Sequence, residues 1–177
     1  MIPAYRQRIT DIHQKLGIPS NYEERFALPL QHEAAHLVDA GLDMFGRSQQ
    51  MEPVTYKHWV TMRDAALDDD VQLLLVSAFR SVEYQTTIIE RKLEQGMTME
   101  EILTASAAPG YSEHHTGQAL DLATIDSPPL VEAFDQTNAF RWLCEHAQQF
   151  DFVMSYPKES KHKIIYEPWH WLFSRSE

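Results

Sequence analysis

The chain contains few cysteines and few basic residues, and both shortages bear on where it could act and what it could bind. Its single cysteine, Cys144, cannot form an intramolecular disulfide, so nothing in the sequence demands an oxidising compartment. Lysine and arginine together number 15, against 26 aspartate and glutamate residues, and the formal net charge is −11. So acidic a chain is a poor partner for nucleic acid or for an anionic membrane surface, which favour basic proteins.

Long apolar runs and flexible linkers are also absent. No stretch approaches the length of a transmembrane helix, and the first residues, MIPAYRQRIT, lack the apolar run of a signal peptide. The sequence has no internal repeat, no low-complexity tract and no linker rich in glycine and serine. We therefore expect one domain over residues 1–177, located in the cytoplasm, and the sequence leaves its oligomeric state open.

Hydrophobic spacing and capping residues predict the order of helices and strands. Helices are expected up to Gly17, over 30–40 and 53–66, from Ser81 to Gly96, after Thr98 and over 137–149. Strands are expected over 71–79, 118–123, 152–156 and 163–167. Helices that come first, followed by short strands that form a small sheet, indicate an α+β fold.

The stretch LQHEAAHLVDA matches H-E-x-x-H, a zinc-protease pattern. On a helix His32 and His36 would share one face and could both bind zinc, with Glu33 activating a bound water. The extended form of this pattern needs a glycine and a third histidine, where this chain has Asp39 and Leu42. We interpret the stretch as an amphipathic helix with two surface histidines, and keep a protease site there as the rival hypothesis.

Polar residues that are unsuited to a core gather in the second half of the chain. His114 and Asp121 are separated by HTGQAL, while Glu167 and His170 stand in YEPWHW. Two histidines and one carboxylate, with a position left open to water, are the ligands of a catalytic zinc site. On a straight strand His114 and Asp121 would lie about 23 Å apart, at about 3.3 Å per residue, so a shared metal requires a turn between them. The Thr-Gly pair in that segment is suited to one.

Three segments of this half resemble the VanY-type D-alanyl-D-alanine carboxypeptidases. SEHHTGQALDL is similar to the signature S-x-H-x-x-G-x-A-x-D, YEPWH is similar to E-x-W-H, and VSAFRSVEYQ is similar to S-x-Y-R-S with Phe79 in place of tyrosine. The resemblance implies the fold shared by lysostaphin-like peptidases, D-Ala-D-Ala metallopeptidases and the hedgehog domain, a small antiparallel sheet flanked by helices. Residues 1–52 would then form an N-terminal helical extension, and 53–173 the family-like core.

The resemblance also implies roles for individual residues. In the family the matched histidine, aspartate and final histidine bind zinc, so the expected ligands here are His114, Asp121 and His170. The glutamate before W-H is the general base and acid, which is Glu167 in this chain. The arginine of the third segment contacts substrate; here it is Arg80, whose planar donors suit a terminal carboxylate or an oxyanion.

Neighbouring residues are expected to support this site or the fold around it. Ser112 and Gln85 could supply further hydrogen bonds to the substrate end. His115 is absent from the family pattern, and we interpret it as structural or surface. His162 is a candidate for a supporting role near the metal but is expected on the loop KESKHK, and the tryptophans of PWHW are expected to pack in the core.

The function implied by the resemblance is that of a zinc metallocarboxypeptidase that removes terminal D-alanine from peptidoglycan-derived peptides. A cytoplasmic enzyme would meet soluble fragments returned from wall turnover, which favours L,D-carboxypeptidase activity on recycled tetrapeptides. D,D-carboxypeptidase or dipeptidase activity on D-Ala-D-Ala ends is the close alternative. A non-catalytic binder of cell-wall peptides is the alternative of another class, and such a protein would be expected to have lost Glu167 or a zinc ligand.

Overall fold

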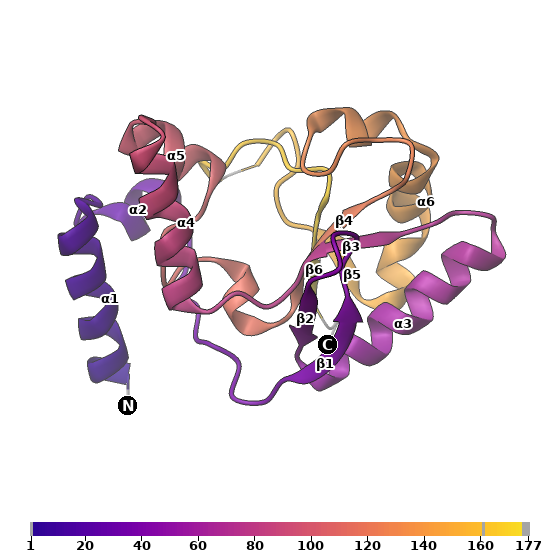
Figure 1. Ribbon diagram of the computed structural model, residues 1–177, viewed down its shortest axis with the longest axis horizontal. Coiled ribbons are helices and arrows are strands. Elements are labelled where there is room, and N and C mark those ends of the chain that lie inside the picture. The colour runs from indigo at the N-terminus through magenta and orange to yellow at the C-terminus, as the bar shows by residue number, and fades with distance from the viewer. Residues whose placement is uncertain (1, 161, 175–177) are drawn as a thin grey trace.

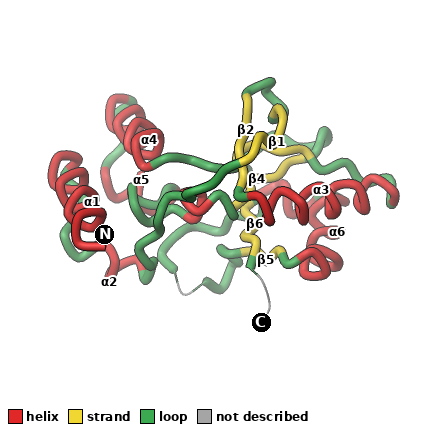
Figure 2. The backbone as a smooth tube through the Cα atoms, turned by 90° about the horizontal axis from the view of Figure 1, so that it is seen from below, coloured by secondary structure: helices red, strands yellow, loops and turns green. Residues whose placement is uncertain are grey.

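The core of the protein is a four-stranded antiparallel sheet. The computed structural model describes residues 2–160 and 162–174. A separate hairpin of two strands lies beyond the sheet, at the opposite edge from β5 (Figure 2). The strands of the sheet, in spatial order, are β3 (Leu74–Ser77), β4 (Ala119–Ala123), β6 (His170–Phe173) and β5 (Phe152–Met154), and the hairpin pairs β1 (Val38–Leu42) with β2 (Ser48–Met51).

Helices flank this sheet at its two ends (Figure 1). The longest, α3 (Pro53–Asp68), lies with α6 (Asn138–His146) at one end. The other end is formed by α1 (Ile2–Leu16), α2 (Tyr22–Phe26), α4 (Val82–Glu94) and α5 (Met99–Ala105). Three short 3₁₀ helices complete the chain: η1 (Glu113–Thr116), η2 (Glu132–Gln136) and η3 (Ala147–Phe150). No helix within the described residues has the length and apolar character needed to cross a membrane.

The buried apolar side chains form two clusters. The first lies between the sheet, α3 and α6 and includes Trp59, Leu120 and Trp171. The second joins α1, α2 and α5 and includes Tyr22 and Leu103. The chain passes between the two clusters several times, and three of these crossings have as end residues Ala78 and Val82, Tyr111 and Leu120, and Ile164 and Trp169. The three segments that resembled a peptidase family each overlap one of these three crossings.

Most of the expected elements are present, and their ends follow from local chemistry. α1 ends before Gly17, which takes a positive φ of 76°. The hydroxyl of Ser81 accepts a hydrogen bond of 3.0 Å from the Tyr84 amide at the start of α4. The Thr98 side chain and Glu101 form the predicted capping box of α5. The expected helix over 137–149 is α6 continued by η3, and the expected strands 71–79, 118–123 and 152–156 are β3, β4 and β5.

The helix expected over 30–40 is wrong. This segment is irregular and ends in β1, because its polar groups bond to distant parts of the chain rather than to one another. The carboxylate of Glu33 accepts from the Val82 amide at 2.8 Å, and the Ala34 amide donates to the His115 carbonyl at 2.8 Å. These tertiary bonds replace the helical ones. The N-terminal 52 residues are therefore helical only in part, and the β1–β2 hairpin was not foreseen.

The strand expected over 163–167 is also wrong. The segment is irregular, and the strand begins three residues later, at His170 in β6. Its backbone groups bond singly to separate neighbours: the Ile165 amide donates to Thr104, and the Glu167 amide donates to Tyr156. Pro168, which cannot donate a backbone hydrogen bond, separates this stretch from the true strand.

Candidate metal centre and active site

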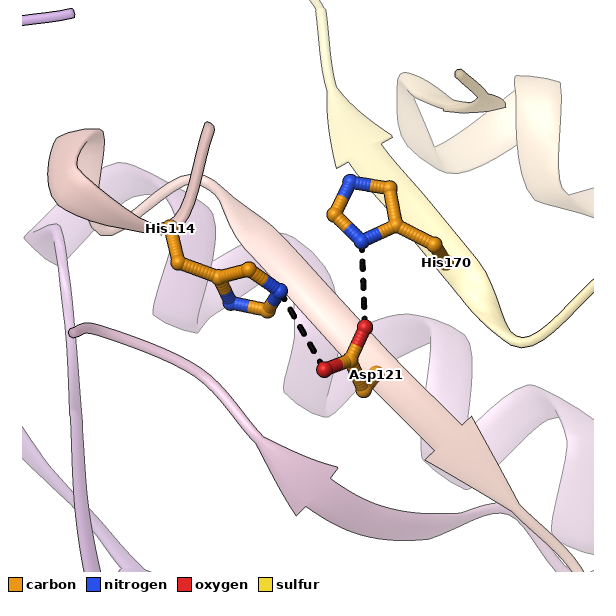
Figure 3. A group of neighbouring side chains, drawn as sticks. All are labelled: His114, Asp121 and His170. Carbon is orange, nitrogen blue, oxygen red and sulfur yellow. Dashed lines mark hydrogen bonds and ion pairs between the residues drawn. The ribbon is translucent and has the colours of Figure 1, made fainter. Parts of the chain in front are cut away.

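Two imidazoles meet one carboxylate at the middle of the sheet (Figure 3). Asp121 lies in β4 directly opposite His170 in β6, so the register of these two strands brings them together. His114 approaches from η1, and Gly117, with a φ of 68°, turns the chain into β4 as the Thr-Gly pair predicted. The Asp121 oxygens lie 3.2 Å from His114 Nε2 and 3.0 Å from His170 Nδ1. All three residues are buried.

His114 is protonated on one ring nitrogen only, and the lone pair of the other nitrogen points at the Asp121 carboxylate. Its Nδ1 lies 2.6 Å from the Ala78 carbonyl, which can only accept, so Nδ1 carries the hydrogen. Burial, aided by the charge of Arg80, lowers the pKa of His114 to about 4, so the ring is neutral at neutral pH. The bare Nε2 therefore faces the Asp121 carboxylate and has no hydrogen-bond partner. Two such atoms repel each other unless a cation lies between them.

The same three residues fit zinc. One possible ligand atom from each lies within 4.8 Å of the others, and no other group of three such side chains was found among the described residues. Neutral imidazole nitrogen and carboxylate oxygen are ligands that Zn²⁺ accepts, and three protein ligands leave one position for water. The expected ligand set, His114, Asp121 and His170, therefore comes together as a group that could bind a metal.

The second imidazole is held by a residue that the sequence did not single out. Nε2 of His170 lies 2.8 Å from the carboxylate of Glu113, while Nδ1 faces Asp121. Burial alone would lower the pKa of His170, but its hydrogen bonds to these two carboxylates raise it to about 10. Glu113 thus fixes which nitrogen points at the metal position, as carboxylates beside metal-binding histidines commonly do. It occupies the unspecified position in S-x-H, so the motif gave no signal for it.

A largely buried carboxyl group stands next to this cluster. Glu167 Oε2 lies 3.9 Å from His170 Nδ1. Burial raises the pKa of Glu167 to about 7, and the charge of Asp121 adds to the effect, although the charge of His170 opposes it. A carboxyl group that titrates near neutral pH can both accept and return a proton under physiological conditions.

The remaining residues expected at the site line the same small pocket. Arg80, Gln85, Ser112 and Glu167 share a pocket of about 40 Å³ with two of the presumed ligands. The Arg80 guanidinium lies 3.6 Å from Asp121 Oδ2, and its buried Nε has no hydrogen-bond partner among the described residues. The fold therefore brings together every residue that the sequence placed at the active site.

Three further histidines lie outside the proposed ligand set. His115 is buried; its Nδ1 donates to the Arg80 carbonyl at 2.6 Å and its Nε2 accepts from the Gly110 amide at 3.0 Å, so its role is structural. His162 lies on the expected loop, with its ring 6.0 Å from that of Tyr156. His32 packs against an aromatic ring at 4.6 Å. The H-E-x-x-H stretch is not helical, so it lacks the arrangement that a zinc site there requires.

The cluster predicts the metal content of variants. Alanine at His114 or His170, or asparagine at Asp121, is expected to reduce zinc from one ion per chain to near zero, since two ligands hold zinc far less tightly than three. His32→Ala and His36→Ala serve as matched controls and are expected to keep their zinc. Metal is measured by elemental analysis on protein whose folding is checked by circular dichroism. Loss of zinc in the controls alone would return the site to the H-E-x-x-H stretch.

Zinc uptake is expected to release a proton from His170. In the metal-free protein this ring is protonated at neutral pH because its pKa is near 10, whereas a ligand nitrogen must be bare. Zinc and proton therefore compete, and the affinity for zinc should rise about tenfold per pH unit between pH 6 and 8. Calorimetry in two buffers of different ionisation enthalpy measures the protons released, about one per zinc. An affinity that does not change over this pH range contradicts the assignment.

Known proteins are similar to this chain in sequence and in fold. The YodJ protein of Bacillus subtilis (strain 168), which is named as a carboxypeptidase, is 30% identical over 83% of this chain and 56% of its own length. The chain spans about half the length of the curated relatives it matches. The solved structure of the LD-carboxypeptidase LdcB, described as showing the basis of peptidoglycan recognition, has a TM-score of 0.72 and 30% identity, over 82% of this chain and 71% of that one.

A solved structure with bound metal supports the same relationship. The vancomycin-resistance D,D-pentapeptidase VanY in complex with Zn(II) has a TM-score of 0.64 and 25% identity, over 84% of this chain and 83% of that one. The family model described as VanY, D-alanyl-D-alanine carboxypeptidase, matches residues 48–176. The match begins within the β1–β2 hairpin and includes the three crossings that overlap the motif segments. By this match over most of its length, the chain belongs to the VanY family.

Proposed function

We propose that this protein is a zinc carboxypeptidase that removes the terminal D-alanine from peptidoglycan-derived peptides, acting as an L,D-carboxypeptidase on tetrapeptides. One observation carries the proposal. A largely buried carboxyl group whose pKa is near 7, that of Glu167, lies 3.9 Å from a ring of the proposed metal-binding cluster and shares one pocket with a guanidinium. A proton acceptor, a metal position and a fixed cation within one pocket are the parts that amide hydrolysis needs.

The ligands His114, Asp121 and His170 would hold the zinc ion. When bound, zinc acidifies water and polarises the carbonyl group of the bond to be cut. Glu167 accepts a proton from the attacking water and then returns it to the nitrogen of the departing D-alanine. Glu113 keeps the hydrogen of His170 on Nε2, so that Nδ1 stays available on the side of Asp121.

Arg80 stands where negative charge would develop on the substrate. Its Nη2 lies 3.6 Å from the Asp121 carboxylate, so the guanidinium is held at the metal cluster. Its buried Nε has no partner in the described part of the chain, so it has a donor free for the carbonyl oxygen of the bond to be cut. We assign Arg80 to this oxygen rather than to the far end of the substrate.

Two polar residues complete the substrate pocket. The Gln85 amide donates to the Ala107 carbonyl at 2.8 Å, which fixes the side chain and leaves its buried Oε1 without a partner. Such an oxygen accepts a hydrogen bond, so an N–H group of the substrate suits it. Ser112 is buried at the start of η1 and lines the same pocket, where its hydroxyl can donate or accept.

The preference for tetrapeptides rests on similarity. The LD-carboxypeptidase LdcB superposes on this chain with a higher TM-score than the D,D-pentapeptidase VanY does, and it has the higher identity. D,D-carboxypeptidase or dipeptidase activity is the alternative within the same chemistry. A non-catalytic binder is disfavoured, because the chain keeps Glu167 and all three presumed ligands. That the tetrapeptides are recycled fragments met in the cytoplasm stays a prediction.

Replacing Glu167 by glutamine is expected to separate metal binding from turnover. The variant keeps the shape of the side chain but cannot accept a proton, so it should hold one zinc per chain while turnover falls about 10²- to 10⁴-fold. Glu159→Gln, which alters an exposed carboxylate in a nearby loop, is the control and should retain the normal rate. A near-normal rate in Glu167→Gln would remove this residue from the mechanism.

Rates on three substrates test the proposed specificity. The zinc-loaded protein is incubated with a free tetrapeptide ending in D-alanine, a free pentapeptide ending in D-Ala-D-Ala, and intact wall sacculi, and the products are identified by mass. We expect the tetrapeptide to be cut fastest, with release of one D-alanine. A clear preference for the pentapeptide would establish the D,D alternative, and a lack of cleavage in all three would contradict the proposed activity.

A further inference from the structure

A second cation, the ammonium group of Lys92, reaches the wall of the active-site pocket. Its Nζ donates a hydrogen bond of 2.7 Å to the hydroxyl of Ser106. Ser106 lines the pocket that also contains Arg80 and Glu167. The Ser106 hydroxyl donates its own hydrogen to the Ala105 carbonyl at 2.7 Å, so it is oriented to accept from the ammonium group. The ammonium group is therefore held at the pocket by a hydrogen bond of fixed direction.

The helix α4 presents Lys92 to the pocket together with Gln85. Residues 85, 89 and 92 lie on one face of the helix, and Ile89 between them is fully buried. Gln85 and Lys92 then bond to successive residues of one segment, Ala107 and Ser106. The packing that places Gln85 in the proposed substrate pocket thus also places Lys92 there.

The charge of Lys92 is not balanced within the described part of the chain. The residue is half-buried, and the only hydrogen bond of its ammonium group there is to the neutral Ser106 hydroxyl, with no ion pair. Burial lowers the pKa of Lys92, the charge of Arg80 lowers it further, and the charge of Glu167 opposes both. A cation partly removed from water without an anion beside it is costly. A negatively charged group that enters the pocket relieves this cost.

The substrate itself supplies such a negatively charged group close to the bond that is cut. A carboxypeptidase substrate ends in a carboxylate one residue beyond the bond that is cut, a span of about 3.8 Å. Because Arg80 lies against Asp121 at the metal cluster, it is suited to the reacting carbonyl. We propose that Lys92, oriented by Ser106, binds the terminal carboxylate of the substrate. This assignment rests on the carboxypeptidase function proposed above. It gives the two cations different roles: Arg80 binds the reacting carbonyl group, and Lys92 binds the terminal carboxylate.

The test compares two peptides that differ only at the end that Lys92 would bind: a tetrapeptide with a free terminal D-alanine and the same peptide as its terminal amide. In Lys92→Met, which keeps an apolar stem but no charge, kcat/KM for the free acid is expected to fall about tenfold to hundredfold, mainly through KM, since a charge-assisted hydrogen bond is lost. The amide should change less than about twofold, because it never made that bond. Arg91→Met, on the exposed face of the same helix turn, is the control.

A charge-preserving variant and checks of folding serve as further controls. Lys92→Arg keeps the charge and should retain most of the preference for the free acid, while zinc content and thermal unfolding report whether each variant is folded. Equal losses on acid and amide, or no loss on either, overturn the assignment.

A binding measurement separates this assignment from the proposed function. N-acetyl-D-alanine and its amide are added to the zinc-loaded protein, and the NMR signal of the Lys92 ε-methylene group is followed. The acid should shift this signal and the amide should not. If the protein cuts no peptide but the acid shifts the signal, the proposed activity fails and the assignment stands; if the acid causes no shift, the assignment fails.

Discussion

The carboxylate of Asp121 is the constraint on which the rest of the site depends. It lies in β4, a strand whose five residues are all buried, with a paired strand on either side. Removing the partners of a buried charge costs about 3–5 kcal/mol, so a buried aspartate has to be surrounded by groups that balance it. The register of β4 and β6 supplies His170, the turn at Gly117 supplies His114, and the segment after β3 supplies Arg80. These groups that stabilise the buried charge are also the proposed catalytic groups.

The site occupies the junction between two hydrophobic clusters. Each cluster is filled by its own apolar side chains, and three of the short stretches that join them overlap the motif segments. Each stretch carries one part of the proposed mechanism: Arg80, the His114 turn, and Glu167. Polar side chains at such a junction are shielded from water by the apolar residues around them, which explains the raised pKa of Glu167 and the lowered pKa of His114. Tyr156 and Trp169 belong to different clusters; the Tyr156 ring lies 4.9 Å from that of His170, and Trp169 directly precedes His170 in the chain.

The sequence predicted those features whose cause is local or is written in a motif. Ser81 and Thr98 mark helix starts because their side chains bond within one turn, and the three motifs identified the presumed ligands and Glu167. The failures share a different cause. Glu33 bonds to an amide 49 positions away, and Glu113 contacts a ring 57 positions away. Neither interaction leaves a periodic or short-range trace, so segment 30–40 was taken for a helix and the role of Glu113 was missed.

Two of the proposed ligands lie in the sheet and the third lies in the η1 turn, and this difference affects which segments unfold locally. β4 and β6 are neighbours in the middle of the sheet, and amides in such strands exchange their hydrogens only in the rarest openings. The η1 turn and the stretch before β6 have few ladder bonds, so they can open on their own at much lower free energy. A metal ion that joins all three ligands would slow exchange in these stretches while leaving β4 unchanged. Loss of the ion would then loosen the catalytic segments without unfolding the sheet, and the vacant protein would remain ready to bind metal again.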